Sequence, residues 1–166
     1  MFRHRESACS GVEQDRGCSG NTGPEPRQTG LPGRPEPQTQ LNQWPVQLML
    51  VPTHASYFTG ADLLIAADCV PFARSGFHGE FLRGRAMVMG CPKLDNPHVY
   101  VDKLAEIFAL HNLTAMEVLV MEVPCCSGMV QIVKTAREKA GVKTPIRVTT
   151  IGVRGEHLGT EELTAG

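Results

Sequence analysis

The chain has 166 residues and a mass of 18.0 kDa, and 42% of its residues are hydrophobic although only 5% are aromatic, which suits one ordinary domain. Its 16 Lys and Arg residues and 17 Asp and Glu residues give a net charge of −1, so it lacks the basic excess of a protein that coats nucleic acid. It contains no apolar run of about 18 residues and no apolar signal-peptide segment at its start, so we expect a cytoplasmic protein that binds neither nucleic acid nor membrane.

The composition changes sharply near residue 44. Residues 1–43 are rich in proline and glycine and contain hardly any large aliphatic side chains. Such a segment buries too little apolar surface to offset the entropy lost on ordering. We therefore predict that residues 1–43 are disordered, with a Pro/Gly-rich linker from Glu25 to Gln40, and that an ordered domain spans residues 44–156. The polar residues 157–166 predict a frayed tail.

Short apolar runs in residues 44–156 predict buried β-strands, because they are continuous rather than alternating. In chain order they are residues 46–51, 63–67, 86–89, 116–123 and 146–151. Apolar residues at helical spacing predict helices over residues 100–111 and 129–140, and a weaker one over residues 72–83, which Gly76 and Gly79 interrupt.

The order of these elements predicts an α/β fold, with a three-layer, mostly parallel, five-stranded Rossmann-like sheet. The direction of the first strand stays open at this stage. Pro52 to Gly60 is a short connection for a parallel crossover, which usually needs a dozen or more residues.

Four cysteines lie where predicted strands end. Cys69 follows the second strand, Cys91 the third, and Cys125 and Cys126 the fourth. The carboxyl ends of parallel strands lie about 4.8 Å apart along one edge, which is where α/β folds bind ligands. The four thiols could therefore share one metal centre, although a single cysteine at such a place is more often a small buried hydrophobic residue. Thiolates are the ligands of iron–sulfur clusters and of zinc.

Local sequence favours ordered and reactive thiols at this edge. Prolines at positions 71, 92 and 124 lie beside the cysteines and restrict the loops. Cys125 and Cys126 open a predicted helix, and the positive end of a helix lowers thiol pKa.

The chain from about Leu41 to Glu156 resembles the C-terminal domain of a family of ferredoxin-like iron–sulfur proteins from anaerobic bacteria and archaea. The resemblance lies in the stretches Asn42 to Leu48, Ala61 to Phe72 (with Ala67-Asp68-Cys69), Gly90-Cys91-Pro92-Lys93-Leu94-Asp95, Met121 to Gly128 (with Pro124-Cys125-Cys126-Ser127-Gly128) and Thr150 to Glu156. It implies an electron-transfer function with a redox partner protein. The match at Cys69, Cys91, Cys125 and Cys126, together with their predicted placement at one sheet edge, leads us to expect that these four cysteines bind an iron–sulfur cluster of the [4Fe–4S] type.

The same resemblance bears on Cys18. In that family two further [4Fe–4S] clusters are held by an N-terminal module with C-x₂-C-x₂-C-x₃-C-P runs, which residues 1–40 lack, so those clusters are not carried over. A Gly-Cys-Pro-Gly segment usually follows the module, and Gly17-Cys18-Ser19-Gly20 is similar to it, with Ser19 in place of proline. Cys18 is therefore a candidate additional or exchange ligand, against the alternative of a free surface thiol.

Several other residues are weaker candidates. The loop Gly152 to Glu156, with Arg154, could hold an anion or could be a solvated loop. His54 could support the metal site or be an ordinary loop histidine, and Asp68 could orient the Cys69 loop. Glu122 lies in an apolar run and is expected to be paired.

No pattern assigns a catalytic residue, because the chain lacks both a nucleophile with an evident base and a nucleotide-binding glycine motif. We expect an iron–sulfur electron-transfer protein or accessory domain rather than an enzyme. Two alternatives stay open. One is a cysteine-based thiol-redox enzyme that uses Cys125 and Cys126, and the other is a zinc-stabilised docking module without turnover.

Overall fold

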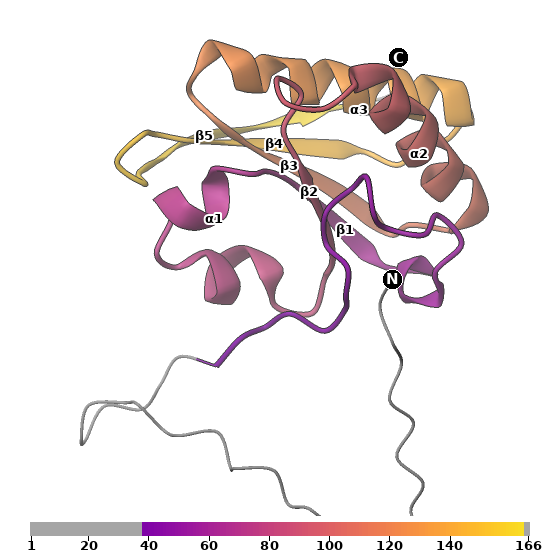
Figure 1. Ribbon diagram of the computed structural model, residues 1–166, viewed down its shortest axis with the longest axis horizontal. Coiled ribbons are helices and arrows are strands. Elements are labelled where there is room, and N and C mark those ends of the chain that lie inside the picture. The colour runs from indigo at the N-terminus through magenta and orange to yellow at the C-terminus, as the bar shows by residue number, and fades with distance from the viewer. Residues whose placement is uncertain (1–37, 165–166) are drawn as a thin grey trace, which may run out of the picture. The chain divides into compact units, whose positions relative to one another are not determined.

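The computed structural model describes residues 38–164, which centre on a five-stranded sheet (Figure 1). The strands lie in the order β2-β1-β3-β4-β5, and their bounds are β1 Asp62–Ala67, β2 Ala86–Gly90, β3 Ala115–Met121, β4 Ile146–Ile151 and β5 His157–Leu163. The first four are parallel, and β5 runs antiparallel to β4. The prediction of a mostly parallel α/β sheet is confirmed.

Helices form the outer layers. The helices α2 (Pro97–Leu110) and α3 (Ser127–Ala140) pack side by side on one face of the sheet, and the short α1 (Val70–Ala73) lies on the other (Figure 1). Asn96 caps α2 by accepting a hydrogen bond from the His98 N–H. Gly141 ends α3 with a φ of 68°, the left-handed conformation that glycine adopts without strain. No helix within residues 38–164 has the length and apolar character needed to span a bilayer.

The predicted weak helix over residues 72–83 is two short pieces instead. α1 ends at Ala73, and a single π-helical turn occupies His78–Leu82. The two long helices were predicted within three residues of their observed bounds, and their predicted faces are buried. The core side chains of α2 include Tyr100, Leu104, Ile107 and Phe108, and those of α3 include Met129, Ile132, Val133 and Ala136.

The predicted first strand, residues 46–51, is wrong. Gln47 makes one isolated parallel bridge to Met89, after which the chain turns. The N–H groups of Leu50 and Val51 both donate to the Gln47 carbonyl oxygen, at 2.9 and 3.0 Å. The run is apolar because Leu48 and Val51 are buried. It lies beside the outer edge of β2, where a free strand edge would otherwise be exposed.

The predicted domain limits, 44–156, are also too narrow. The Gln43 side chain donates to the Met87 carbonyl oxygen at 2.7 Å and accepts from the Met87 N–H at 3.0 Å, so the folded part begins before Trp44. The predicted frayed tail, 157–166, contains β5, whose backbone pairs with β4 from Ile146 to Ile151. Residues 1–37, for which the sequence predicts disorder, lie outside the described residues, and so does the candidate ligand Cys18.

Candidate cysteine site

The structure brings all four candidate cysteines of the described region to one edge of the sheet. Cys69 lies just after β1, Cys91 follows β2 directly, and Cys125 and Cys126 lie in the turn Pro124–Cys126 between β3 and α3. Because β1 lies between β2 and β3, these are three neighbouring strands. The chain leaves β1 toward β2 on one side and continues to β3 on the other, so this edge is a topological switch point, where open α/β sheets bind ligands.

The four thiols are all free but differ in exposure. Cys69 and Cys125 are exposed, Cys91 is half-buried and Cys126 is buried. Burial raises the pKa of the Cys126 thiol, and the nearby Cys125 and Cys69 raise it further. The sequence argument from the helix terminus predicts a lowered thiol pKa here. For Cys126 the loss of hydration acts in the opposite direction and raises the pKa.

The first turn of α3 faces this edge without a side-chain cap. Its N-cap position is Cys126, and the Ser127 hydroxyl donates to the Pro124 carbonyl oxygen at 2.8 Å instead of capping the helix. The turn contains no acidic residue. The Cys126 and Ser127 N–H groups donate to the carbonyl oxygens of Val123 and Pro124. It is therefore the dipole of α3, with its positive end at the cysteines, that suits a ligand with negatively charged sulfur atoms.

A buried tyrosine holds the Cys91 loop. The Tyr100 hydroxyl, on α2, accepts a hydrogen bond from the Cys91 N–H at 3.2 Å and donates to the Asp95 carboxylate. Burial and Asp95 raise the pKa of Tyr100, so the phenol stays protonated at neutral pH. The Gln47 side chain also donates to Asp95, at 3.3 Å. Sequence reasoning placed Tyr100 in the core but missed this role, because nothing in the pattern shows where its hydroxyl points.

Asp68 is a second carboxyl group at this edge. Its N–H donates to the Gly90 carbonyl oxygen at 3.2 Å, which joins the Cys69 and Cys91 loops through the backbone. One carboxylate oxygen, Oδ1, is buried without a hydrogen-bond partner in the described part of the chain. Burial and the neighbouring Asp95 raise the pKa of Asp68.

The loop after β4 does not offer the anion site considered from the sequence. The Val153 N–H already donates to the Glu122 carboxylate at 2.8 Å, and the Arg154 N–H donates to Glu156 at 3.1 Å. The chain's own carboxylates thus occupy these amides. Glu122 follows β3 rather than lying within it, and its predicted pairing is confirmed, with a backbone group as the partner. His54 is exposed.

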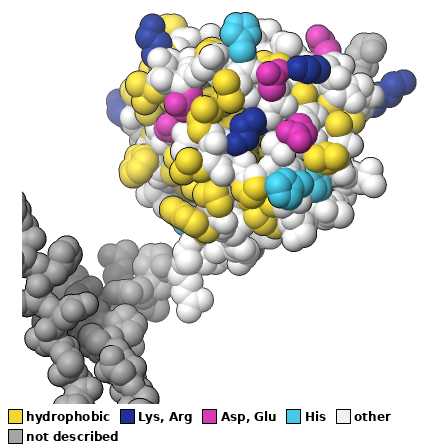
Figure 2. Space-filling model, turned by 45° about the vertical axis from the view of Figure 1, so that its right-hand side comes forward, with side chains coloured by type: hydrophobic (Ala, Val, Ile, Leu, Met, Phe, Trp, Pro, Cys, Tyr) yellow, Lys and Arg dark blue, Asp and Glu magenta, His cyan; other side chains and the backbone are white. Residues whose placement is uncertain are grey.

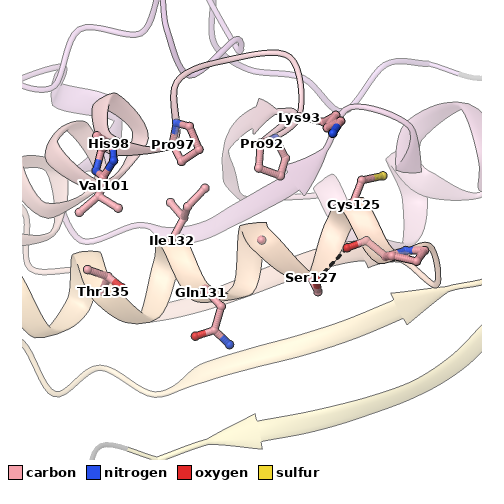
Figure 3. A pocket seen from close by; sticks show the side chains of 12 residues that line it. Pro92, Lys93, Pro97, His98, Val101, Cys125, Ser127, Gln131, Ile132 and Thr135 are labelled. Atoms are coloured by element: carbon pink, nitrogen blue, oxygen red, sulfur yellow. Dashed lines mark hydrogen bonds between the residues drawn. The ribbon is translucent and has the colours of Figure 1, made fainter.

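A groove runs from Cys125 between α2 and α3 (Figure 3). Its volume is about 480 Å³, and Cys125 and Lys93 lie at one end of it. Apolar side chains from both helices line it, among them Val101 and Ile132. Lys93 and His98 are the titratable side chains in its lining besides Cys125. An external molecule can therefore approach Cys125 along an apolar surface.

Comparison with known proteins agrees with this topology. A family model for a Rossmann-like domain matches residues 55–165. The chain belongs to this Rossmann-like family. It is also similar to an uncharacterized protein of Archaeoglobus fulgidus, with 33% identity over 116 residues that cover 70% of this chain and 81% of the relative. No solved structure matches the chain.

Zinc and iron–sulfur clusters place different demands on the spacing of cysteine ligands. Within residues 38–164 no three His, Cys, Asp or Glu side chains are placed to hold one ion together. A single zinc ion needs its sulfur ligands about 2.3 Å from one point. A [4Fe–4S] cluster needs four cysteines, and each binds a different iron atom, so its ligands stand farther apart. Four cysteine thiols on three neighbouring strand ends are donors of the type that such a cluster uses.

The exposure of the thiols gives a first testable result. In metal-free protein at pH 7, iodoacetamide is expected to modify Cys69 and Cys125 at least about tenfold faster than Cys126, because Cys126 is buried and its raised pKa leaves less thiolate. Timed samples analysed by peptide mass spectrometry measure each rate. Equal rates at pH 7 would contradict this account and favour a reactive Cys125–Cys126 pair.

Proposed function

We propose that this Rossmann-like domain binds an iron–sulfur cluster of the [4Fe–4S] type and serves in electron transfer. Cys69, Cys91, Cys125 and Cys126 are the proposed ligands, and Cys18, outside the described residues, is an additional or exchange ligand. The observation that carries the proposal is the gathering of four free cysteines on three adjacent strand ends. When bound, such a cluster supplies one-electron redox chemistry.

The chain's own residues support each part of this role. Four thiol sulfurs are soft donors of the kind that iron–sulfur clusters require. The uncapped first turn of α3 stabilises negative charge beside Cys125 and Cys126. The Tyr100 hydrogen bond fixes the backbone of Cys91. Burial of Cys126 keeps part of the site away from water, and burial is one of the factors that set a cluster's reduction potential.

Exposed apolar side chains support a protein partner for this site. Phe72, Leu94 and Val153 are 88, 81 and 61% exposed, and they lie in α1 after β1, in the loop after β2 and in the loop after β4. Hydrophobic side chains also gather between charged ones on the face shown in Figure 2. Large apolar side chains that are exposed on neighbouring loops are candidate contacts for another protein. We therefore propose a redox partner protein that contacts the cysteine edge, in the cytoplasm, where thiols stay reduced.

Anaerobic reconstitution with iron and sulfide tests the cluster. The full chain is expected to take up iron and sulfide in equal amounts and to gain a broad absorbance near about 400 nm, the region of sulfide-to-iron charge transfer. Each of the substitutions Cys69→Ser, Cys91→Ser, Cys125→Ser and Cys126→Ser is expected to remove most of the iron. The matched control is Cys9→Ser, which replaces a cysteine outside the proposed set and should leave uptake unchanged.

The same experiment separates the alternatives. A colourless protein without iron after reconstitution would overturn the proposal. About one zinc per chain, with loss of the fold on adding a chelator, would indicate a structural docking module. A metal-free protein with a fast-reacting Cys125 would indicate thiol chemistry.

A further inference from the structure

We propose that Tyr100 and Asp95 form a clamp that positions Cys91 as a cluster ligand and keeps the Cys91 N–H away from the cluster's sulfur atoms. The part of this inference that concerns the cluster rests on the proposed function. The part that concerns the conformation of Cys91 does not. The clamp comprises Tyr100, Asp95 and Gln47.

The Cys91 loop is held by contacts from α2, from the segment beside β2 and from within the loop itself. Tyr100 reaches the loop from α2 and is fully buried, and its hydroxyl contacts both the Cys91 N–H and the Asp95 carboxylate. Gln47 donates to the same carboxylate at 3.3 Å from the segment beside β2. The Asp95 N–H closes the loop by donating to the Cys91 carbonyl oxygen at 3.1 Å. The backbone N–H and carbonyl groups of Cys91 are therefore both engaged.

Gly90 shows how closely Tyr100 approaches the end of β2. A Cβ atom at position 90 would overlap the Tyr100 ring and hydroxyl. The ring thus lies directly against the residue that precedes Cys91. A phenylalanine would fill the same space but would leave the Cys91 N–H and the Asp95 carboxylate without this shared partner, so the hydroxyl has a role separate from packing.

The clamp has a consequence for a bound cluster. Hydrogen bonds to the sulfur atoms are one of the factors that set the reduction potential of a cluster. In this structure the Cys91 N–H is directed to Tyr100 and is not free to donate to a sulfur. Removing the hydroxyl would leave that N–H free to donate to a sulfur of a bound cluster, and such a bond would stabilise the more negative, reduced state. The potential of a Tyr100→Phe variant should therefore move in the positive direction.

Labelling of the metal-free full chain tests the clamp without any cluster. In Tyr100→Phe, iodoacetamide is expected to modify Cys91 about five- to tenfold faster than in the unmodified chain, the change expected from losing one hydrogen bond. Cys69 and Cys125 in the same sample are internal controls and should react at unchanged rates. Asp95→Ala should reproduce the effect, whereas Asp95→Asn retains an oxygen that accepts from Tyr100 and should restore slow labelling.

The outcomes separate the clamp from the proposed function. Unchanged labelling of Cys91 in Tyr100→Phe, with the melting transition retained, would overturn the clamp whether or not the chain binds a cluster. Faster labelling in a chain that takes up no iron would support the conformational part and overturn the cluster part together with the proposed function. If a cluster forms, an unchanged potential in Tyr100→Phe would overturn the redox part alone.

Discussion

Replacing Glu117 with alanine is expected to lower the free energy of unfolding by about 3 kcal/mol, because the change leaves a largely buried charge with fewer partners. Glu117 lies within β3 and is 5% exposed. Its carboxylate pairs with Arg85 at 2.5 Å and accepts from the Thr149 hydroxyl at 2.8 Å. Arg85 keeps a second pair with Asp62, at 2.8 Å, which places the effect at the lower end of the range for a broken buried pair.

Two variants test this explanation of the Glu117 effect. The double substitution Arg85→Met with Glu117→Leu removes both charges, and it should destabilise the chain less than Glu117→Ala alone. Asp102→Ala breaks an ion pair with Lys139 at 2.7 Å, in which the Asp102 side chain is 66% exposed and the Lys139 side chain 55% exposed. Because the pair is exposed, its loss should change the free energy of unfolding by less than about 1 kcal/mol. Urea unfolding followed by circular dichroism measures all three. A loss below about 1 kcal/mol for Glu117→Ala would show that Arg85 and Thr149 find other partners.

The positions of the cysteines were predictable because they depend on features that a sequence displays. Each lies at or near the end of a continuous apolar run, and such runs form buried parallel strands. The observed β1 and β4 match the runs 63–67 and 146–151 to within one residue. Once the strands are parallel, their carboxyl ends share an edge without any further information. The shared edge of the site therefore follows from the hydrophobic pattern, whereas the order of the strands within the sheet does not.

The two errors at the edges of the sheet have one cause. An edge strand is held mainly by backbone hydrogen bonds, so its side chains need not be apolar. The strand β5 is polar and almost wholly exposed. Its sequence therefore contains no apolar run that would reveal its pairing with β4. Residues 46–51 show the converse, because Leu48 and Val51 are buried although the backbone makes only an isolated bridge at Gln47. Burial and strand pairing coincide inside the sheet and separate at its edges.

The polar contacts of Glu117 and Tyr100 could not be predicted from the sequence, for a different reason. Glu117 interrupts an apolar strand, which indicates a buried partner but not its identity. Arg85 lies 32 residues earlier in the chain, and only the parallel pairing of β1 with both β2 and β3 brings the two together. Tyr100 likewise has an ordinary helical position, and its contact with Cys91 depends on how α2 crosses the end of β2. Such pairs depend on the three-dimensional arrangement, which hydrophobic periodicity does not specify.

Replacing Gly155 with alanine is expected to cost about 3 kcal/mol or more, through two effects that add. Gly155 has a φ of 86°, a conformation that costs an L-residue about 1–2 kcal/mol. A Cβ atom there would also overlap the backbone carbonyl oxygen of Ala73, and forced overlap typically costs a further 1–3 kcal/mol, roughly. The shift would disturb the hydrogen bond from Arg74 Nη1 to the Gly155 carbonyl oxygen, now 2.7 Å.

Gly141→Ala is the matched control, because it separates strain from overlap. Gly141 has a φ of 68° but open space where a Cβ would lie, so alanine there should cost only about 1–2 kcal/mol. The difference between the two variants in urea unfolding then measures the contact of the β4 loop with α1. Because α1 begins directly after Cys69, Gly155→Ala should also speed the iodoacetamide labelling of Cys69, and under the proposed function reduce iron uptake, while Gly141→Ala does neither. Equal losses of stability would show that the loop yields freely, and that its packing against α1 does not hold Cys69 in place.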